Sequence, residues 1–395
     1  MIRRLVAALA LLAPPPALAA PPPATVVVAF DRDSITPLIV EGLANKQTGR
    51  ALEANDPVRI ASISKLIMAL TALRLMDEGK VDLTRDVSDY LGWKLRSPYH
   101  PDVAVTLSHL LSHRAGLSDK AGYIIPLGES LEAKLGDPAA WRDTGPPGDA
   151  AFEYANLGSP LVATALEAAS GERYDRLVER LVFAPLGVKA CLNWLGCGPD
   201  MEARAVTLYR DTGEVARDAP EDLPPACTIP VAEGQPCDLA SYVPGTNASI
   251  FSPQGGVRIG MMDLAKIGQA LLRMERNGFL SDKAAELWIY ALIGSANDDA
   301  SGAAAAGFCG YGLGAYGLLA FDPCKDDLFQ DGRERLGHGG EAYGLRSGLW
   351  FSIADDQGFA YFTTEVPPPS GEVETAAADP RETALMVRAL EMVGE

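Results

Sequence analysis

The stretch that decides the fold is residues 59–79, with the sequence RIASISKLIMALTALRLMDEG. It predicts a helix over residues 62–78, and Gly79 follows as a typical helix-ending residue. Large apolar side chains recur along it and form a broad stripe: Ile63, Leu66, Ile67, Leu70, Leu73 and Leu75. A helix this uniformly apolar is buried, so we expect it in the middle of the molecule.

The first turn of this helix carries a serine and a lysine that could act together. Residues three apart share a helix face, so Ser62 and Lys65 converge at the N-terminal end. A serine hydroxyl needs a neighbouring base to become a nucleophile, and a lysine of lowered pKa can supply one. The helix N-terminus also favours developing negative charge. An SxxK tetrapeptide alone is weak, because about one chance match is expected in a chain of this length.

Two further triplets carry chemistry of the same kind. Tyr154-Ala155-Asn156 offers a phenol that can transfer a proton and an amide that can orient a lysine or a substrate. His338-Gly339-Gly340 offers a histidine beside glycines that permit close backbone approach. Each triplet alone is equally compatible with a core tyrosine and a turn, or with a glycine-rich turn and a buried histidine.

The rest of the chain predicts strands at both ends and helices between them. Residues 25–30 (TVVVAF) predict a buried strand and residues 38–40 its return strand. Residues 349–354 and 359–364 flank the turn Asp355-Asp356-Gln357-Gly358 and predict a hairpin. We expect one antiparallel sheet from about 25–80 and 250–395, with a mostly helical insertion at about 81–250. Residues 191–243, long and acidic, predict an elaborated loop region.

The three motifs, in this order and context, resemble those of the serine hydrolases that include class C β-lactamases, penicillin-binding D,D-peptidases, D-aminopeptidases and related esterases. The phrases that carry the resemblance are RIASISK at 59–65, LLSHRAGL at 110–117, SPQGG at 252–256 and GHGG at 337–340. It covers most of residues 25–395 except 191–243. It implies an α/β (α+β) fold of the β-lactamase/transpeptidase type, a central antiparallel sheet flanked by helices.

The resemblance also implies catalytic roles. Ser62 would be acylated by the substrate carbonyl, and Lys65 and Tyr154 would form the proton-transfer pair. Water would then hydrolyse the acyl-enzyme. Ser64 lies on another face from Lys65 and is a weak rival, so we expect it to support the helix.

Four more positions would meet the substrate on the same resemblance. Asn156 would hold the substrate's amide side chain, and His338 and Gly340 would line the opposite wall on a strand. The backbone N–H groups of Ser62 and Glu341 would form the oxyanion hole.

The substrate is less well indicated than the reaction. Many β-lactamases of this family carry a lysine and a threonine in the third motif, where this chain has His338 and Gly339. Arg346 could replace the missing charge, although a solvent-facing salt bridge is the better expectation. Three hypotheses follow: an amidohydrolase or peptidase acting on D-amino-acid peptides or, weakly, β-lactams; a carboxylesterase; and a non-catalytic penicillin-binding relative.

The composition and the N-terminal residues indicate which partners and which compartment to expect. The 395 residues carry a net charge of −18, which argues against nucleic acid as a partner. The small-molecule or peptide substrate that we expect is what the resemblance implies. Residues 1–19 predict a cleaved signal peptide, hence a periplasmic or secreted protein with no membrane anchor after cleavage.

The sulfur and histidine content predicts disulfides rather than metal. Six cysteines in an exported chain predict disulfides, and although about 15 pairings are compatible with the sequence, we expect pairing in sequence order because each short loop closes easily. This gives Cys191–Cys197, Cys227–Cys237 and Cys309–Cys324. With four histidines and no CxxC pair, neither a metal site nor an organic cofactor is implied. Residues 312–317 fit GxGxxG but lead into a predicted strand, so we expect no dinucleotide site there.

Overall fold

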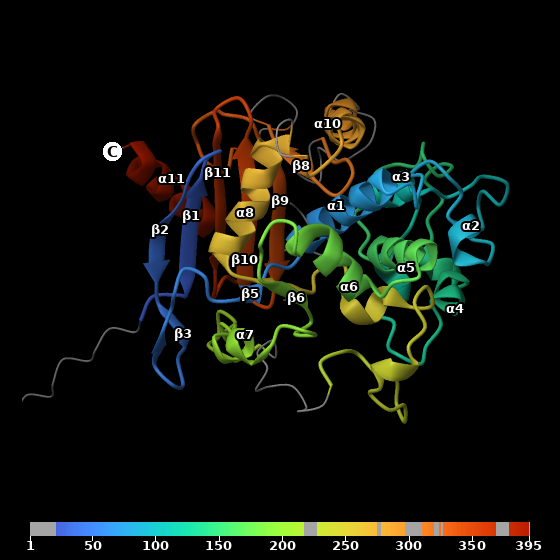
Figure 1. The fold of residues 1–395 in the computed structure, drawn as a ribbon, viewed down its shortest axis with the longest axis horizontal. Coiled ribbons are helices and arrows are strands. Elements are labelled where there is room, and N and C mark those ends of the chain that lie inside the picture. Colours follow the sequence, from blue (N-terminus) through green and yellow to red (C-terminus); the bar gives the residue numbers. More distant parts are fainter. Residues whose placement is uncertain are drawn as a thin grey trace, which may run out of the picture.

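The centre of the molecule is a six-stranded antiparallel sheet built from both ends of the chain (Figure 1). The computed structural model describes residues 21–216, 227–274, 278–296, 308, 310–319, 324, 327–368 and 379–394. The strand order is β2-β1-β11-β10-β9-β8. The strands are β1 (Thr25–Phe30), β2 (Ile35–Glu41), β8 (Tyr316–Leu318), β9 (Arg335–Ala342), β10 (Leu345–Ser352) and β11 (Gln357–Thr363). The mixed α/β fold with an antiparallel sheet is therefore as predicted.

Both faces of this sheet are covered, which explains why β1 has no polar side. Val26, Val28 and Phe30 belong to a core shared with helices α1 (Ile63–Asp77) and α8 (Met261–Leu272). Val27 and Ala29 belong to a second core with α11 (Pro380–Gly394). Successive side chains of a strand point to opposite faces, so a strand buried on both faces is apolar throughout.

A second group of helices lies beside the sheet rather than over it, and α1 runs between the two parts (Figure 1). These helices are α2 (Ser88–Leu91), α3 (Leu107–Leu111), α4 (Leu131–Leu135), α5 (Gly158–Ser170) and α6 (Tyr174–Val178). The last continues as a π-helix, Glu179–Phe183. Two further helices are α7 (Pro199–Ala203) and α10 (Asp282–Ala296). Single 3-10 turns lie at Asp119–Ala121, Pro138–Ala140, Leu239–Ser241 and Ala248–Phe251.

Two small sheets complete the fold, and one of them positions the site. The three-stranded sheet has the order β5-β7-β6, with β5 at Val58–Arg59, β6 at Ala190–Leu192 and β7 at Val257–Ile259. It joins the residues just before α1 to those just after the SPQGG segment. The two-stranded sheet pairs β3 (Leu43–Asn45) with β4 (Arg50–Ala51).

Two of the three predicted disulfides are present. Cys191 pairs with Cys197 and Cys227 with Cys237, with Cα–Cα distances of 5.1 and 5.7 Å. The third predicted pair includes Cys309, which lies outside the described residues, as does the predicted signal peptide at residues 1–19. Across the described part of the chain, no helix combines the length and apolarity needed to cross a bilayer.

Candidate active site

Ser62 stands at the first turn of α1, as the sequence predicts. Strand β5 ends shortly before Ser62, which is the N-cap residue of α1, and the helix itself begins at Ile63. The preceding Ala61 has a φ of +45°, a left-handed conformation that costs an alanine about 1–2 kcal/mol. The helix continues to Asp77, with Gly79 in the left-handed conformation after it.

The ammonium group of Lys65 has three hydrogen-bond acceptors around it, one for each of its N–H donors. Lys65 Nζ donates to Ser62 Oγ at 3.1 Å, to Asn156 Oδ1 at 2.8 Å and to the carbonyl oxygen of Gln254 at 3.3 Å. The side chain is 1% exposed. A buried lysine with three acceptors is held in one orientation, and that orientation points at the serine hydroxyl.

Asp119 fixes the orientation of Asn156. It accepts hydrogen bonds from Asn156 N at 2.9 Å, from Asn156 Nδ2 at 3.0 Å and from Leu157 N at 2.9 Å. Because a carboxylate accepts, the amide nitrogen of Asn156 must face Asp119. The amide oxygen is thereby turned toward Lys65.

The SPQGG segment reaches Lys65 because β7 follows it. Val257 N donates to Ser64 Oγ at 3.1 Å, and Ile60 N donates to Val257 O at 3.2 Å. These bonds fasten β7 to the start of α1 and bring the carbonyl of Gln254 to the lysine. Ser64 therefore supports the helix start, as predicted for it.

Tyr154 lies directly over the ammonium group of Lys65. The distance from Nζ to the centroid of the phenol ring is 4.5 Å, within the range of a cation–π contact. The ring is stacked on Phe308, with centroids 4.5 Å apart and planes 6° apart. On another side it contacts the ring of His113 at 4.5 Å. The phenol is thus placed by aromatic packing rather than by its own segment alone.

His338, Gly340 and Glu341 all lie on β9, opposite the start of α1. Gly340 is so close to the preceding turn that a Cβ there would overlap the Ile60 carbonyl oxygen and the Ser347 hydroxyl. This approach brings residues 340–341 beside residues 60–62, the arrangement that the predicted oxyanion hole requires. That the backbone N–H groups of Ser62 and Glu341 form this oxyanion hole stays a prediction.

His338 is turned into the protein. It is 1% exposed, and its ring nitrogens meet Tyr311 Oη at 3.2 Å and the Gly339 carbonyl oxygen at 2.5 Å. Burial, and then the positive charge of Lys65, lowers the pKa of His338 to about 3, so the ring is neutral. Direct contact between His338 and a substrate stays a prediction.

The expectation for Arg346 needs one correction. Arg346 forms a salt bridge with Glu341 at 2.9 Å and lies 3.9 Å from Glu382 of α11. The salt-bridge role is as expected, but the side chain is 12% exposed and is not solvent-facing. It is engaged on the α11 side of the sheet, so nothing in its contacts replaces the missing lysine of the third motif.

Three residues of this cluster were not assigned to the site from the sequence: Asp119, His113 and Tyr311. His113 lies in the LLSHRAGL phrase at 110–117, which resembles the family but did not indicate what His113 does. Tyr311 directly precedes the GxGxxG stretch, whose own function is packing. Gly314, with a φ of +74°, lies against the Lys65 carbonyl oxygen, where a Cβ would come within 2.6 Å. Within the described residues, no group of three or more His, Cys, Asp or Glu could hold a metal ion.

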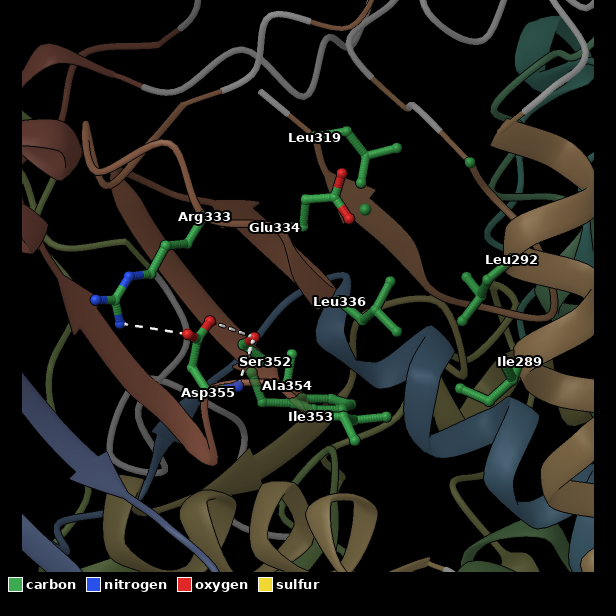
Figure 2. A pocket seen from close by; sticks show the side chains of 13 residues that line it. Ile289, Leu292, Leu319, Arg333, Glu334, Leu336, Ser352, Ile353, Ala354 and Asp355 are labelled. Atoms are coloured by element: carbon green, nitrogen blue, oxygen red, sulfur yellow. Dashed lines mark hydrogen bonds and ion pairs between the residues drawn. The ribbon is translucent and has the colours of Figure 1, made fainter. Parts of the chain in front are cut away.

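A separate cavity of about 620 Å³ lies between α10 and the sheet (Figure 2). Its walls are mainly apolar, with Ile289 and Leu292 of α10 facing Leu319 and Leu336. At one end Arg333 forms an ion pair with Asp355 at 3.5 Å. None of the predicted site residues lines this cavity, so it is distinct from the cluster around Ser62.

The sheet, the central helix and the serine–lysine pair define a hydrolase of the β-lactamase/transpeptidase fold. The model of the Beta-lactamase family matches residues 22–381. The chain belongs to this family, whose members are serine hydrolases: peptidases, amidohydrolases and esterases.

Three curated proteins are similar over part of their length. Penicillin-binding protein 4 of Amycolatopsis lactamdurans is 24% identical over 196 residues, 50% of each chain. Esterase EstB of Burkholderia gladioli is 28% identical over 170 residues, 38% of this chain and 42% of EstB. The D-alanyl-D-alanine-carboxypeptidase/endopeptidase AmpH of Escherichia coli K12 is 32% identical over 145 residues, 35% of this chain and 37% of AmpH. The matches thus span half or less of these relatives.

Solved structures match over more of the chain and show the fold. A D-stereospecific amidohydrolase from Streptomyces has a TM-score of 0.61 and 18% identity, covering 92% of both chains. A class C β-lactamase from Rhodobacter sphaeroides has a TM-score of 0.63 and 15% identity, covering 94% of both chains.

Proposed function

We propose that this protein hydrolyses acyl compounds through a covalent ester on Ser62. The observation that carries the proposal is the 3.1 Å contact between Lys65 Nζ and Ser62 Oγ at the start of a buried helix, in a chain of the Beta-lactamase family. A nucleophile in hydrogen-bond contact with a potential base, which a third group orients, is the arrangement that covalent catalysis needs. Asn156 is that third group.

The reaction has two steps in this proposal. Ser62 Oγ attacks the substrate carbonyl carbon and gives its proton to Lys65, which takes part in this step as the neutral amine. Lys65 then passes a proton to Tyr154, whose hydroxyl proton goes to the leaving nitrogen as the C–N bond breaks. Water then attacks the ester, its proton passes to the same pair, and Ser62 regains its hydroxyl. The N–H groups of Ser62 and Glu341 would stabilise the oxyanion in both steps.

The substrates we favour are amides: D-amino-acid peptides and, weakly, β-lactams. The support is the histidine at position 338, where the resemblance points to D,D-peptidases and D-aminopeptidases. The match to AmpH agrees with this choice. The engagement of Arg346 with Glu341 argues against strong binding of a carboxylated β-lactam through that arginine.

A carboxylesterase is the second candidate. The same engagement of Arg346 favours it, because an ester substrate needs no carboxylate anchor. The similarity to EstB supports this alternative. Turnover of short acyl esters with no cleavage of peptides or lactams would select it.

The test is intact-protein mass spectrometry after mixing with penicillin G, p-nitrophenyl acetate and D-alanine p-nitroanilide, with turnover followed by absorbance. Wild type should gain an acyl adduct or turn over at least one compound, and Ser62→Ala should do neither. Ser64→Ala is the comparison for the identity of the nucleophile: Ser64 is a buried serine on the same turn that accepts from Val257 N, so this variant should still form the adduct on Ser62, although its rate can fall as β7 loses that bond. Equal reactivity of Ser62→Ala and wild type would refute the proposal.

We also propose that the protein works outside the cytoplasm. The sequence of residues 1–19 and the two local disulfides support export, because disulfides persist in oxidising compartments. Detection of uncleaved protein in the cytoplasm of its natural host would contradict this.

A further inference from the structure

A chain of hydrogen bonds runs behind the candidate site and joins two backbone groups. Ala155 N donates to His113 Nδ1 at 3.2 Å, and His113 Nε2 lies 3.2 Å from Tyr311 Oη. Tyr311 Oη in turn lies 3.2 Å from His338 Nε2, and His338 Nδ1 lies 2.5 Å from the Gly339 carbonyl oxygen. Three buried side chains therefore connect residue 155 to β9.

Both ends of this chain fix its direction. A backbone N–H can only donate, so His113 Nδ1 carries no proton and the proton of the neutral ring is on Nε2. A carbonyl oxygen can only accept, so His338 carries its proton on Nδ1 and leaves Nε2 as an acceptor. Tyr311 must then accept from His113 and donate to His338.

The two ends belong to the two walls of the candidate site. Ala155 lies between Tyr154 and Asn156, while Gly339 adjoins Gly340. The His113 ring, besides accepting from Ala155, contacts the Tyr154 ring at 4.5 Å. These hydrogen bonds thus connect the segment that carries Tyr154 to strand β9, which faces Ser62.

We propose that His113 and Tyr311 are positioning residues, which through this one-directional chain hold Tyr154 over Lys65 and hold His338 neutral as its Nδ1–H tautomer. The inference rests on the proposed function, because it concerns the same site. Neither residue needs to touch the substrate: each acts through the groups it holds.

The fixed donor-to-acceptor direction of these hydrogen bonds also disfavours protonation of His338, which lies near Lys65. If His338 gained a proton on Nε2, the Tyr311 hydroxyl could no longer donate to it and would point its proton at the Nε2–H of His113. Moving the His113 proton from Nε2 to Nδ1 would relieve that clash but would set the Nδ1–H against the backbone N–H of Ala155. The titratable groups that face His338 are Lys65, His113, Tyr154, Tyr311 and Tyr316. Burial, followed by the charge of Lys65, lowers the pKa of both histidines. No second positive charge then competes with Lys65.

The tautomers can be read directly by NMR of protein labelled with ¹⁵N-histidine. We expect His113 as the Nε2–H form and His338 as the Nδ1–H form, both neutral at pH 7, with assignments from single histidine variants. A His338 ring protonated on Nε2, or a His113 ring protonated on Nδ1, would overturn the proposal. This arm needs no substrate, so its result is independent of the proposed function.

The kinetic arm uses Tyr311→Phe and a fluorescent phosphonate that labels an activated serine. We expect the limiting rate of labelling to fall about 10- to 100-fold, with little change in the concentration for half-maximal rate, because the groups are misplaced and the binding surface is not. The His338 Nε2 resonance should shift in the same variant. An unchanged limiting rate would overturn the positioning role.

The control is Tyr242→Phe, which removes another buried tyrosine hydroxyl, one bonded to Glu167 instead. It should keep the wild-type labelling rate and histidine resonances even if its stability falls. A tenfold loss of rate in both variants would assign the effect to lost stability and count against the proposal. If wild type is not labelled at all, the proposed function fails, while the tautomers still decide the hydrogen-bond chain.

Discussion

At the scale of single residues, Asp119 is the group on which the orientation of Asn156 depends. Asp119→Asn should place an amide NH₂ against at least one of the three N–H donors that the carboxylate now accepts. A buried donor without an acceptor costs about 1–3 kcal/mol, so we expect a loss of that size in the free energy of unfolding. Phosphonate labelling of Ser62 should also slow about tenfold or more as Asn156 turns away from Lys65. Urea unfolding and labelling kinetics measure the two effects.

Asp137→Asn is the matched control for this change. Asp137 caps a 3-10 turn by accepting from Ala139 N at 2.8 Å, and asparagine caps a helix start as well as aspartate does. It should leave both stability and labelling close to wild type. Equal behaviour of the two variants would show that Asp119 has no special part in the site.

The contrast between Lys65 and Asp119 shows what the sequence could predict at this scale. Ser62 and Lys65 are three residues apart on one helix, so their contact follows from helix geometry alone. Asp119 and Asn156 are separated by 37 positions, and Tyr311 and His113 by 198. No local spacing encodes such contacts, because they depend on how loops from different parts of the chain are packed.

At the scale of elements, the approach of β9 to the start of α1 shapes the site. Gly340→Ala would drive a methyl group into the Ile60 carbonyl and the Ser347 hydroxyl. Because backbone cannot move as a side-chain tip can, β9 should shift away from residues 60–62. We expect a loss of about 1–3 kcal/mol in unfolding free energy, and slower labelling of Ser62 because residue 341 moves with the strand. Gly255→Ala, whose methyl would meet Ala61 only at 3.7 Å, should retain wild-type stability.

The hairpin of β10 and β11 shows how far elements could be predicted. The hairpin itself was predicted, but its turn lies at residues 353–356 rather than at 355–358. Ser352 pairs with Gln357 and Phe351 with Gly358, so the last two residues of the predicted turn belong to β11. The first half of β10 was missed, because residues 345–348 (LRSG) have little strand propensity. They are extended because β9 and β11 pair with them on both sides. The three-residue strands β6 and β7 were missed for the same reason: their pairing partners, rather than their own sequence, make them strands.

At the scale of the whole molecule, the long segment before β7 is fastened to the helical part at a buried carboxyl group. Glu167 of α5 accepts from Tyr242 Oη at 2.5 Å, Gly245 N at 2.8 Å and Tyr174 N at 2.7 Å. Burial raises the pKa of Glu167 from 4.5 to about 7, against the opposing effect of these three hydrogen bonds. Helix α5, the start of α6 seven residues later, and the distant residues 242–245 therefore meet at one group whose pKa lies near neutral pH.

This contact predicts a pH dependence of stability with a definite sign. Between pH 4.5 and about 7 the folded state binds the Glu167 proton more tightly than the unfolded state, so its stabilising contribution is full below pH 4.5 and is lost as pH rises through 7. The loss amounts to about 3 kcal/mol. His113 and His338, whose pKa values are lowered, act oppositely: their contribution is present above pH 6.5 and is lost as pH falls. The effect of Glu167 must therefore be measured as a difference between variants.

Urea unfolding of wild type and Glu167→Gln from pH 5 to 8 isolates that difference, since both proteins share the histidines. Glu167→Gln should be less stable at pH 5, because its amide NH₂ faces backbone N–H donors, and the gap should narrow by up to about 3 kcal/mol toward pH 8 as wild type alone ionises. Tyr242→Phe removes a hydrogen bond that favours the carboxylate, so its stability should continue to fall with pH above 7. Parallel curves for all three proteins would mean that Glu167 does not titrate in this range, and that the meeting of α5, α6 and the 239–246 segment is insensitive to its charge.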